Sequence, residues 1–405
     1  PGDGEGGTPP SAEGREAEAP FDLLERVRGD ELDPFHQALA RTAARRDGAV
    51  TRVVHLGDSS IGLDQLTHGI RWRFQQRFGD AGPGFVLLQP HSASYRHRLA
   101  HPLVRQEWDF CFLIFRCRKD GHYGLGGVTF RSGGGAASVY KVPRPKGGPP
   151  ASPPPATRFE LWYAHQPRGG QLDVLVGSDR RSLDTSGPRL EDARYVRRLP
   201  REARWVKVRA RGGGPVRAYG IVLEHDAPGV VWDGLSMIGA FTHRLLAQDA
   251  AHLAGQIRWR DPDLVVLSYG GNDLRRYVGG RVDEDELAGE TEQVIRHVRR
   301  GRPGVACMVV GINDHRKSGA LAVGPDEVEA VIRAQRRAAR AEGCAFFDTY
   351  RAMGGRGAFE RWAAHRPPLV ANDKKHLTSA GRNILARRIY DALLRDHRRY
   401  RLRRF

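Results

Sequence analysis

The sequence predicts an α/β protein whose open parallel sheet is interrupted by an antiparallel β-sandwich. Towards both ends of the chain, short apolar runs alternate with segments of helical periodicity, which is typical of a parallel sheet covered by helices. Between about residues 100 and 228 the helical period is lost, and glycine- and proline-rich breaks separate successive strand-like runs. A chain of 405 residues is expected to form two domains.

The first part of the predicted parallel sheet contains one strand between two helices. Residues 33–46 are predicted to form a helix with Asp33 as N-cap and Pro34 at its first position. The short valine-rich run 51–56 ends at a Gly-Asp-Ser turn, as expected of a buried parallel strand. Apolar residues at helical spacing predict a second helix over residues 63–78.

Six strand-like runs form the predicted sandwich: residues 110–115, 127–130, 159–163, 172–176, 205–208 and 219–223. Within it, residues 143–155 are a proline-rich loop. The alternation of strands and helices then returns. The strands expected after residue 229 are 230–233, 264–269, 305–310 and 345–348, and the helices are 241–253, 284–300, 325–342 and 376–394. Together with residues 51–56, this gives a parallel sheet of five strands.

The pattern divides the chain into three parts. Residues 1–30 are predicted to be a disordered tether, because they are rich in Gly, Pro, Glu and Ala. Residues 31–99 and 229–405 would form one discontinuous α/β domain, with residues 100–228 inserted as the sandwich. The sequence begins at Pro1 and not at Met, so we expect a preceding segment to have been removed or left out.

The net charge of +18 and the pI of about 10.3 raise the question of a nucleic-acid partner. The basic residues are spread along the chain without a nucleic-acid-binding motif, so such a partner is not favoured. An arginine-rich composition, or attraction to an anionic envelope polymer, explains the charge. The arginines of residues 395–404 are expected to be a solvated tail. No apolar run reaches about 18 residues, so no transmembrane segment is predicted.

The four cysteines have no metal-site spacing. A straight strand would hold Cys111 and Cys117 on one face but too far apart to pair. Cys307 and Cys344 each stand near the start of an apolar run, and their thiols would be close if those runs are neighbouring strands. We expect free core cysteines in preference to disulfides.

Two short motifs supply the groups of a nucleophilic serine. The Gly-Asp-Ser turn places Ser59 after a strand, and an Asp-x-x-His segment places Asp373 and His376 just before the last helix. A serine hydroxyl is a poor nucleophile unless a base takes its proton and a third group orients that base. At a spacing of three residues, Asp373 and His376 can lie on the same side of a turn.

Two further apolar runs end in loops that contain Gly239 and Asn272. Together, these four segments resemble the blocks of the SGNH (GDSL-type) hydrolases. The resemblance implies a flavodoxin-like three-layer fold and a Ser59–His376–Asp373 triad. It also implies an oxyanion hole made by the backbone N–H groups of Ser59 and Gly239 and the side-chain amide of Asn272. A glycine permits close backbone approach, and an amide is a neutral donor.

The inserted sandwich makes the chain similar to bacterial peptidoglycan O-acetylesterases. The segments 347–349, 353–357 and 361–362, shortly before the Asp-x-x-His motif, also resemble that subgroup. One departure is Ser60, where the GDSL name implies Leu; it leaves two adjacent serines, and only the register of the motif favours Ser59. The resemblance implies an exported esterase, periplasmic, envelope-bound or extracellular, that removes O-acetyl groups from an envelope polysaccharide. The sandwich would then resemble a carbohydrate-binding module.

Other interpretations stay open at this stage. A lipase-like SGNH esterase, a polysaccharide O-acetyltransferase and a non-catalytic polysaccharide-binding protein fit the same motifs. Asp58 and Asp273 are expected to tie down turns. No metal or organic cofactor is expected, because no glycine-rich phosphate loop occurs and the histidines have no metal-like arrangement: His55, His68, His91, His97 and His101. The aromatic residues Trp162, Tyr163 and Trp205 are expected in the core.

Overall fold

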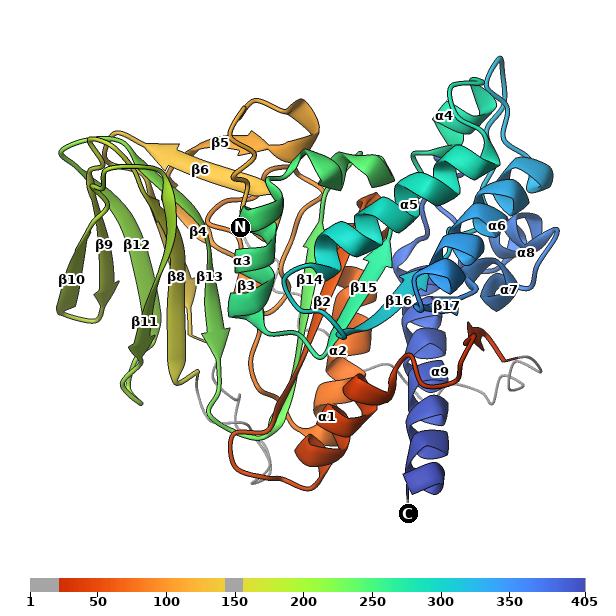
Figure 1. Ribbon diagram of the computed structural model, residues 1–405, viewed down its shortest axis with the longest axis horizontal. Coiled ribbons are helices and arrows are strands. Elements are labelled where there is room, and N and C mark those ends of the chain that lie inside the picture. Colours follow the sequence, from red (N-terminus) through yellow and green to blue (C-terminus); the bar gives the residue numbers. More distant parts are fainter. Residues whose placement is uncertain (1–21, 143–155, 405) are drawn as a thin grey trace.

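A computed structural model describes residues 22–142 and 156–404 (Figure 1). The predicted proline-rich loop, residues 143–155, and residues 1–21 of the predicted tether lie outside the described residues. The described part has three sheets, one mainly parallel and two antiparallel.

The mainly parallel sheet has the strand order β1-β17-β16-β15-β2-β14. Its five parallel strands are β2 (Val50–Gly57), β14 (Gly229–Ser236), β15 (Leu264–Ser268), β16 (Ala306–Val310) and β17 (Ala345–Phe347). A sixth strand, β1 (Leu24–Glu25), pairs antiparallel with β17. All residues of β14, β15 and β16 are buried, because helices cover both faces of the sheet.

The two layers of helices pack on different hydrophobic clusters. One face is covered by α1 (Asp33–Ala43), α2 (Gln65–Phe78) and α9 (Ser379–Arg404). The other is covered by α3 (Ala250–Arg260), α5 (Glu284–Arg299) and α6 (Pro325–Ala341). Three shorter helices, α4 (Leu274–Val278), α7 (Thr349–Met353) and α8 (Ala358–Ala364), lie in the connections. So do three 3-10 turns, η1 (Ser59–Asp64), η2 (Leu113–Phe115) and η3 (Thr242–Ala247).

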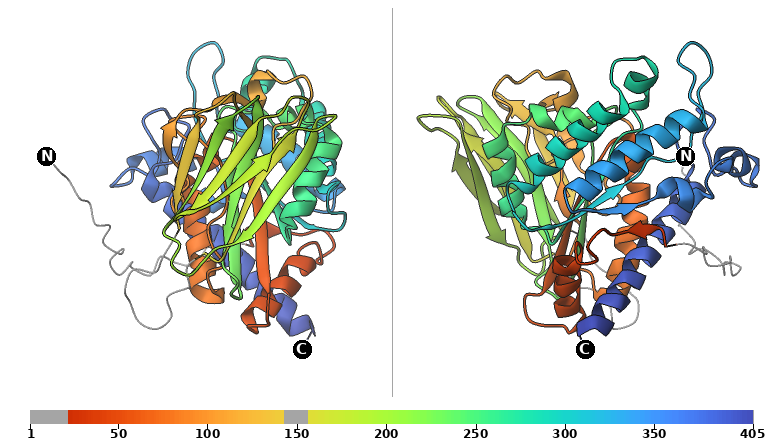
Figure 2. Two further views of the ribbon diagram at one scale, coloured as in Figure 1. Left: turned by 90° about the vertical axis from the view of Figure 1, so that its left-hand side faces the viewer. Right: turned by 45° about the vertical axis from the view of Figure 1, so that its right-hand side comes forward.

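The two antiparallel sheets lie beside the parallel one (Figures 1 and 2). One has the order β10-β9-β12-β7-β4, with β4 (Leu103–Gln106), β7 (Ala137–Lys141), β9 (Gln171–Val176), β10 (Asp179–Asp184) and β12 (Trp205–Gly212). The other has the order β11-β8-β13-β6-β5, with β5 (Asp109–Phe112), β6 (Val128–Ser132), β8 (Arg158–His165), β11 (Glu191–Arg198) and β13 (Val216–Glu224). A short strand before residue 100, β3 (Gly84–Val86), also pairs with β13. Trp162 is fully buried and Tyr163 nearly so, while Trp205 is half-buried.

The prediction that the cysteines are free is wrong. The four cysteines form two disulfides, Cys111–Cys117 and Cys307–Cys344. The strand predicted over residues 110–115 ends at Phe112, and the 3-10 turn η2 reverses the chain. The Cα atoms of Cys111 and Cys117 therefore lie 6.0 Å apart, a distance that a straight strand does not allow. Cys307 follows the start of β16 and Cys344 directly precedes its neighbour β17.

Both ends of the described chain are more ordered than predicted. Residues 22–30 belong to no tether, since they contain β1 and a turn in which the Glu31 carboxylate accepts three backbone N–H groups. The arginine-rich C-terminus is a helix and not a free tail, since α9 continues to Arg404 with Leu393, His397 and Tyr400 buried at helical spacing. Most arginines of residues 395–404 are exposed, as expected.

Three predicted helix boundaries also differ. The N-cap of α1 is Leu32, and Asp33 is the first helical residue. The helix predicted over residues 241–253 is divided into η3 and α3, and Asp249 caps α3 by accepting the His252 N–H. The last helix begins at Ser379, three residues later than predicted. No helix of the described residues is long and apolar enough to cross a membrane.

Candidate active site

Ser59 lies directly after β2, at the carboxyl end of the parallel sheet. Gly57, the last residue of β2, packs closely on the next strand, since an added Cβ would lie 2.9 Å from the Ser268 carbonyl oxygen. The buried Asp58 carboxylate caps the turn by accepting the Ser60 N–H at 2.8 Å, as the sequence predicted for a turn residue. The Ser59 Oγ is 2.7 Å from His376 Nε2.

His376 is oriented by Asp373. The Asp373 Oδ2 lies 2.5 Å from His376 Nδ1, and its Oδ1 accepts the backbone N–H groups of Lys375 and His376 at 3.0 and 2.9 Å. Burial raises the pKa of Asp373, but the hydrogen bonds from His376 and Lys375 outweigh it and lower the pKa to about 2. With Asp373 ionised, Nδ1 carries the proton and Nε2 is left to accept the Ser59 hydroxyl proton.

Two backbone N–H groups at this end of the sheet are unpaired. Gly239 is exposed, has a φ of +81°, and follows β14, while Ser59 opens η1 after β2. Within residues 22–142 and 156–404, neither N–H has a hydrogen-bond acceptor. Unpaired donors next to a serine hydroxyl can accept a negative oxygen.

The Asn272 side chain is held in one orientation. Its Nδ2 donates to the Ala240 carbonyl at 2.9 Å and more weakly to the Asp58 carboxylate at 3.4 Å. Its Oδ1 accepts a hydrogen bond of 2.8 Å from the Lys375 ammonium. Because the contact with Asp58 is long, one of the two amide hydrogens of Asn272 makes only a weak hydrogen bond.

Lys375 is a polar neighbour that the sequence pattern did not single out, because it occupies a variable position of Asp-x-x-His. Burial lowers the pKa of Lys375, and Asp58 opposes this effect. Burial raises the pKa of Asp58. The hydrogen bond from the Ser60 N–H and the charge of Lys375 act in the opposite direction but do not outweigh burial. Lys375, Asn272 and Asp58 thus form a largely buried network of one cation, one amide and one carboxylate beside Ser59.

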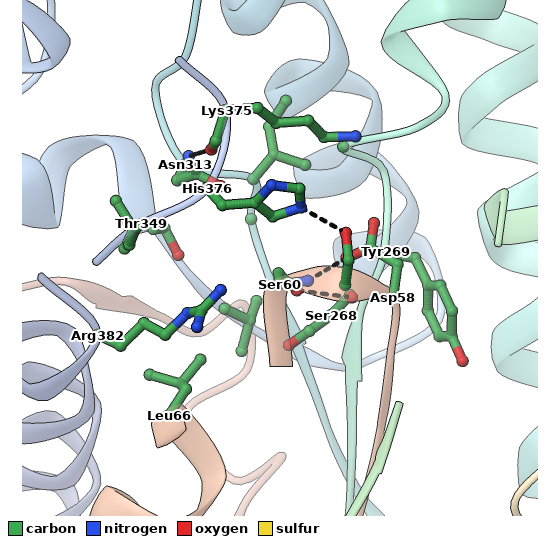
Figure 3. Close-up of a pocket in the computed structure, with 16 residues that line it drawn as sticks. Asp58, Ser60, Leu66, Ser268, Tyr269, Asn313, Thr349, Lys375, His376 and Arg382 are labelled. Carbon is green, nitrogen blue, oxygen red and sulfur yellow. Dashed lines mark hydrogen bonds between the residues drawn. The ribbon is translucent and has the colours of Figure 1, made fainter. Parts of the chain in front are cut away.

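A small pocket opens next to Ser59 and His376 (Figure 3). Its lining comes from the carboxyl ends of three parallel strands, from α2, α7 and α9, and from the Asp-x-x-His loop: Asp58, Ser59, Ser60, Leu66, Ser268, Tyr269, Gly271, Val310, Gly311, Ile312, Asn313, Thr349, Lys375, His376, Leu377 and Arg382. Thr349 and Arg382 were also not predicted, since no sequence signal brings α7 and α9 to this point.

Two groups of carboxylates and histidines outside this pocket have the proximity of metal ligands, and neither suits a cation. In the first, His252 Nε2 already accepts the Gly124 N–H at 2.7 Å, so its Nδ1 carries the proton that points to Asp192. In the second, the Arg276 guanidinium already occupies the space between the three ligands, bonding His243 at 2.9 Å and Glu290 at 2.6 Å. Neither group includes any of the five histidines considered from the sequence.

Residues 185–384 match the model of the GDSL-like lipase/acylhydrolase family, and this range contains Gly239, Asn272, Asp373 and His376. This part of the chain is thus similar to the GDSL-like acylhydrolases, and the similarity supports a carboxylic ester hydrolase. The match begins after Ser59, because the antiparallel sheets separate β2 from the rest of the parallel sheet in sequence, and only the fold returns Ser59 to His376.

The chain is similar in fold to a solved structure described as "Peptidoglycan O-acetylesterase in action", with a TM-score of 0.76 and 21% identity over 93% of this chain and 99% of that chain. A lipase/acylhydrolase from Enterococcus faecalis matches 42% of this chain and 77% of its own at 16% identity, with a TM-score of 0.32. A comparison with curated protein sequences gives no match. The first similarity confirms the SGNH hydrolase fold predicted from the sequence.

Proposed function

We propose that this protein is an SGNH-type serine esterase that removes O-acetyl groups from a cell-wall or envelope polysaccharide. The observation that carries the proposal is the continuous hydrogen-bonded path from Ser59 Oγ through His376 to Asp373. In the first step, His376 Nε2 takes the Ser59 proton while Oγ attacks the acetyl carbonyl carbon. His376 then gives the proton to the leaving sugar hydroxyl, and an acetyl-serine remains.

Water completes the reaction on the acetyl-serine. His376 removes a proton from the water, the hydroxide attacks the acetyl carbon, and Ser59 leaves with the proton as acetate is released. In both steps, the negative oxygen would accept the unpaired N–H groups of Ser59 and Gly239. We assign the third donor to Asn272, whose contact with Asp58 is long enough to be exchanged for the substrate oxygen. Lys375 fixes the direction of that amide.

The acetyl group, as opposed to a long acyl chain, suits the pocket beside Ser59. Its volume of about 40 Å³ is enough for about three water molecules by the same measure. The similarity to a structure described as a peptidoglycan O-acetylesterase also supports an acetylated envelope polymer. We take the two antiparallel sheets as an inserted module that helps to hold the polymer.

An extracytoplasmic location fits the cysteine chemistry. All four cysteines of the chain are paired in two disulfides, and disulfides form and persist in oxidising compartments. The net charge of +18 would favour contact with an anionic envelope polymer.

The test compares acetate release from O-acetylated peptidoglycan with release from acetylated xylan, for the wild type and for Ser59→Ala. The proposal expects release from peptidoglycan that Ser59→Ala abolishes. Higher activity on long-chain p-nitrophenyl esters than on the acetate would instead indicate a lipase-like esterase, and transfer of acetate to a sugar would indicate a transferase. Binding of the polymer without any turnover would indicate a non-catalytic protein.

A further inference from the structure

Arg382 is a buried cation without a carboxylate partner. It lies in the first turn of α9 and is 8% exposed. Its Nη1 donates to the neutral Gln65 Oε1 at 2.8 Å, and its Nε is buried without an acceptor. Among the described residues, no carboxylate lies within ion-pair distance of it. A buried charge without a counter-charge is costly, unless the site is built to receive one.

The guanidinium faces the pocket that Ser59 and His376 line. Figure 3 shows Arg382 directed toward the middle of the pocket, with Thr349 and Leu66 on the same side and His376 above. The Thr349 hydroxyl is also buried without a partner, so two unused donors share this end of the pocket.

The one carboxylate that influences Arg382 is already occupied. Burial lowers the pKa of Arg382, and Asp373 acts in the opposite direction from a distance. Both Asp373 oxygens accept hydrogen bonds from the Asp-x-x-His loop, two at Oδ1 and one at Oδ2. Asp373 therefore does not satisfy the guanidinium, and an anion entering the pocket would.

We infer that Arg382 and Thr349 form a carboxylate-binding subsite beside Ser59. The guanidinium supplies charge-assisted hydrogen bonds and Thr349 one hydroxyl donor, while Leu66, Val310 and Leu377 provide apolar walls. The cavity volume of about 40 Å³ suits a carboxylate on a group of about one or two carbon atoms. That carboxylate is either the acetate released by the reaction or an acidic substituent of the polymer next to the ester. The inference rests on the proposed esterase function for its biological meaning.

Direct binding tests the subsite without turnover. Acetate is titrated into the Ser59→Ala protein and followed by NMR of ¹³C-labelled acetate at constant ionic strength. Arg382→Gln in the same background should weaken binding about tenfold to a hundredfold, the usual worth of a charged hydrogen bond. Arg382→Lys should retain part of the affinity. The control is Arg398→Gln, which removes the same charge from an exposed position on the same helix.

Kinetics then separate the two sources of carboxylate. If the occupant is the product, acetate inhibits p-nitrophenyl acetate hydrolysis competitively, and Arg382→Gln raises the inhibition constant about tenfold or more. If it is an acid on the substrate, Arg382→Gln raises KM for O-acetyl-lactate more than for p-nitrophenyl acetate. Equal acetate affinity in the Arg382→Gln and Arg398→Gln proteins, each checked for an unchanged melting temperature, overturns the subsite. Acetate binding that depends on Arg382, together with a wild-type protein that has no esterase activity, would support the subsite and refute the proposed function.

Discussion

Arg260 joins the parallel sheet to an antiparallel one through a buried ion network, and its replacement by Met should destabilise the protein strongly. Its Nη1 donates to Glu224 on β13 at 2.6 Å and its Nη2 to Asp233 on β14 at 3.1 Å. Arg52 on β2 donates to both carboxylate oxygens of Glu224, at 3.0 and 2.8 Å. The exposed fractions of Arg260, Glu224 and Asp233 are 3%, 3% and 0%. In Arg260→Met, Asp233 would lose its ion-pair partner, and Glu224 would keep only Arg52.

The size of the loss in unfolding free energy follows from the lowered pKa of the Glu224 carboxylate. Burial raises the pKa of Glu224, but Arg260 and Arg52 outweigh it and lower the pKa from 4.5 to about 2. At about 1.4 kcal/mol per pKa unit, the ionised network stabilises the folded state by about 3 kcal/mol through Glu224. Removing one partner of a buried ion pair costs about 3–5 kcal/mol in other proteins. We therefore expect Arg260→Met to lower the free energy of unfolding by at least about 3 kcal/mol at pH 7.

The pH dependence gives the prediction its sign. Because the pKa of Glu224 is lowered in the folded state, its stabilisation is complete above about pH 4.5 and is lost as the pH falls toward 2. The difference in free energy of unfolding between the wild type and Arg260→Met should thus be smaller at pH 3 than at pH 7. Urea denaturation with intact disulfides measures it, and Arg258→Met, on the exposed side of the same helix, is the control. A loss below about 1 kcal/mol at pH 7, or a gap that is the same at both pH values, would refute the reasoning.

Four further predictions concern the proposed chemistry and the disulfides. Ser59→Ala should abolish esterase activity with an unchanged melting curve while Ser60→Ala retains it, and a phosphonate found on Ser60 by mass spectrometry would reverse the assignment. Asn272→Ala should lower kcat about 10²–10³-fold with little change in KM, whereas normal kcat in a destabilised protein would remove it from the mechanism. Lys375→Met should lower kcat about tenfold or more by freeing the Asn272 amide, and Lys375→Arg should lower it less. Loss of the Cys307–Cys344 disulfide, which closes a loop of 37 residues, should cost about 4 kcal/mol against about 2 for the six-residue loop, measured by urea denaturation of the alanine variants.

The sequence predicted the parts of the fold that have a clear period. Valine-rich runs such as residues 51–56 and 264–269 are buried on both faces, so they stand out as apolar, and the residues after them meet at one edge of the sheet. The two-residue strand β1 has no period to detect. The Cys111–Cys117 disulfide was missed because periodicity does not show the 3-10 turn that reverses the chain between them.

The C-terminal helix was missed for a different reason. Its arginines dominate the composition, although Leu393, His397 and Tyr400 stand at helical spacing and mark a buried stripe. Lys375 and Arg382 carry no such signal. Each is one basic residue among 65, and only the fold shows that one meets Asn272 and the other faces the pocket.

The antiparallel sheets take part in the candidate site through the loop between β5 and β6. Ile114 of this loop is the nearest side chain to the space beside Gly239, at 3.9 Å from where a Cβ would lie. The loop is bonded to the segment that follows Gly239: the Gly124 carbonyl accepts from Gln248 at 2.7 Å, and the Gly124 N–H donates to His252 at 2.7 Å. The Cys111–Cys117 disulfide ties the first part of the same loop back to β5. Because these bonds are buried, we expect the folded loop to help fix the direction of the Gly239 N–H, which would give the antiparallel sheets a part in the proposed oxyanion hole.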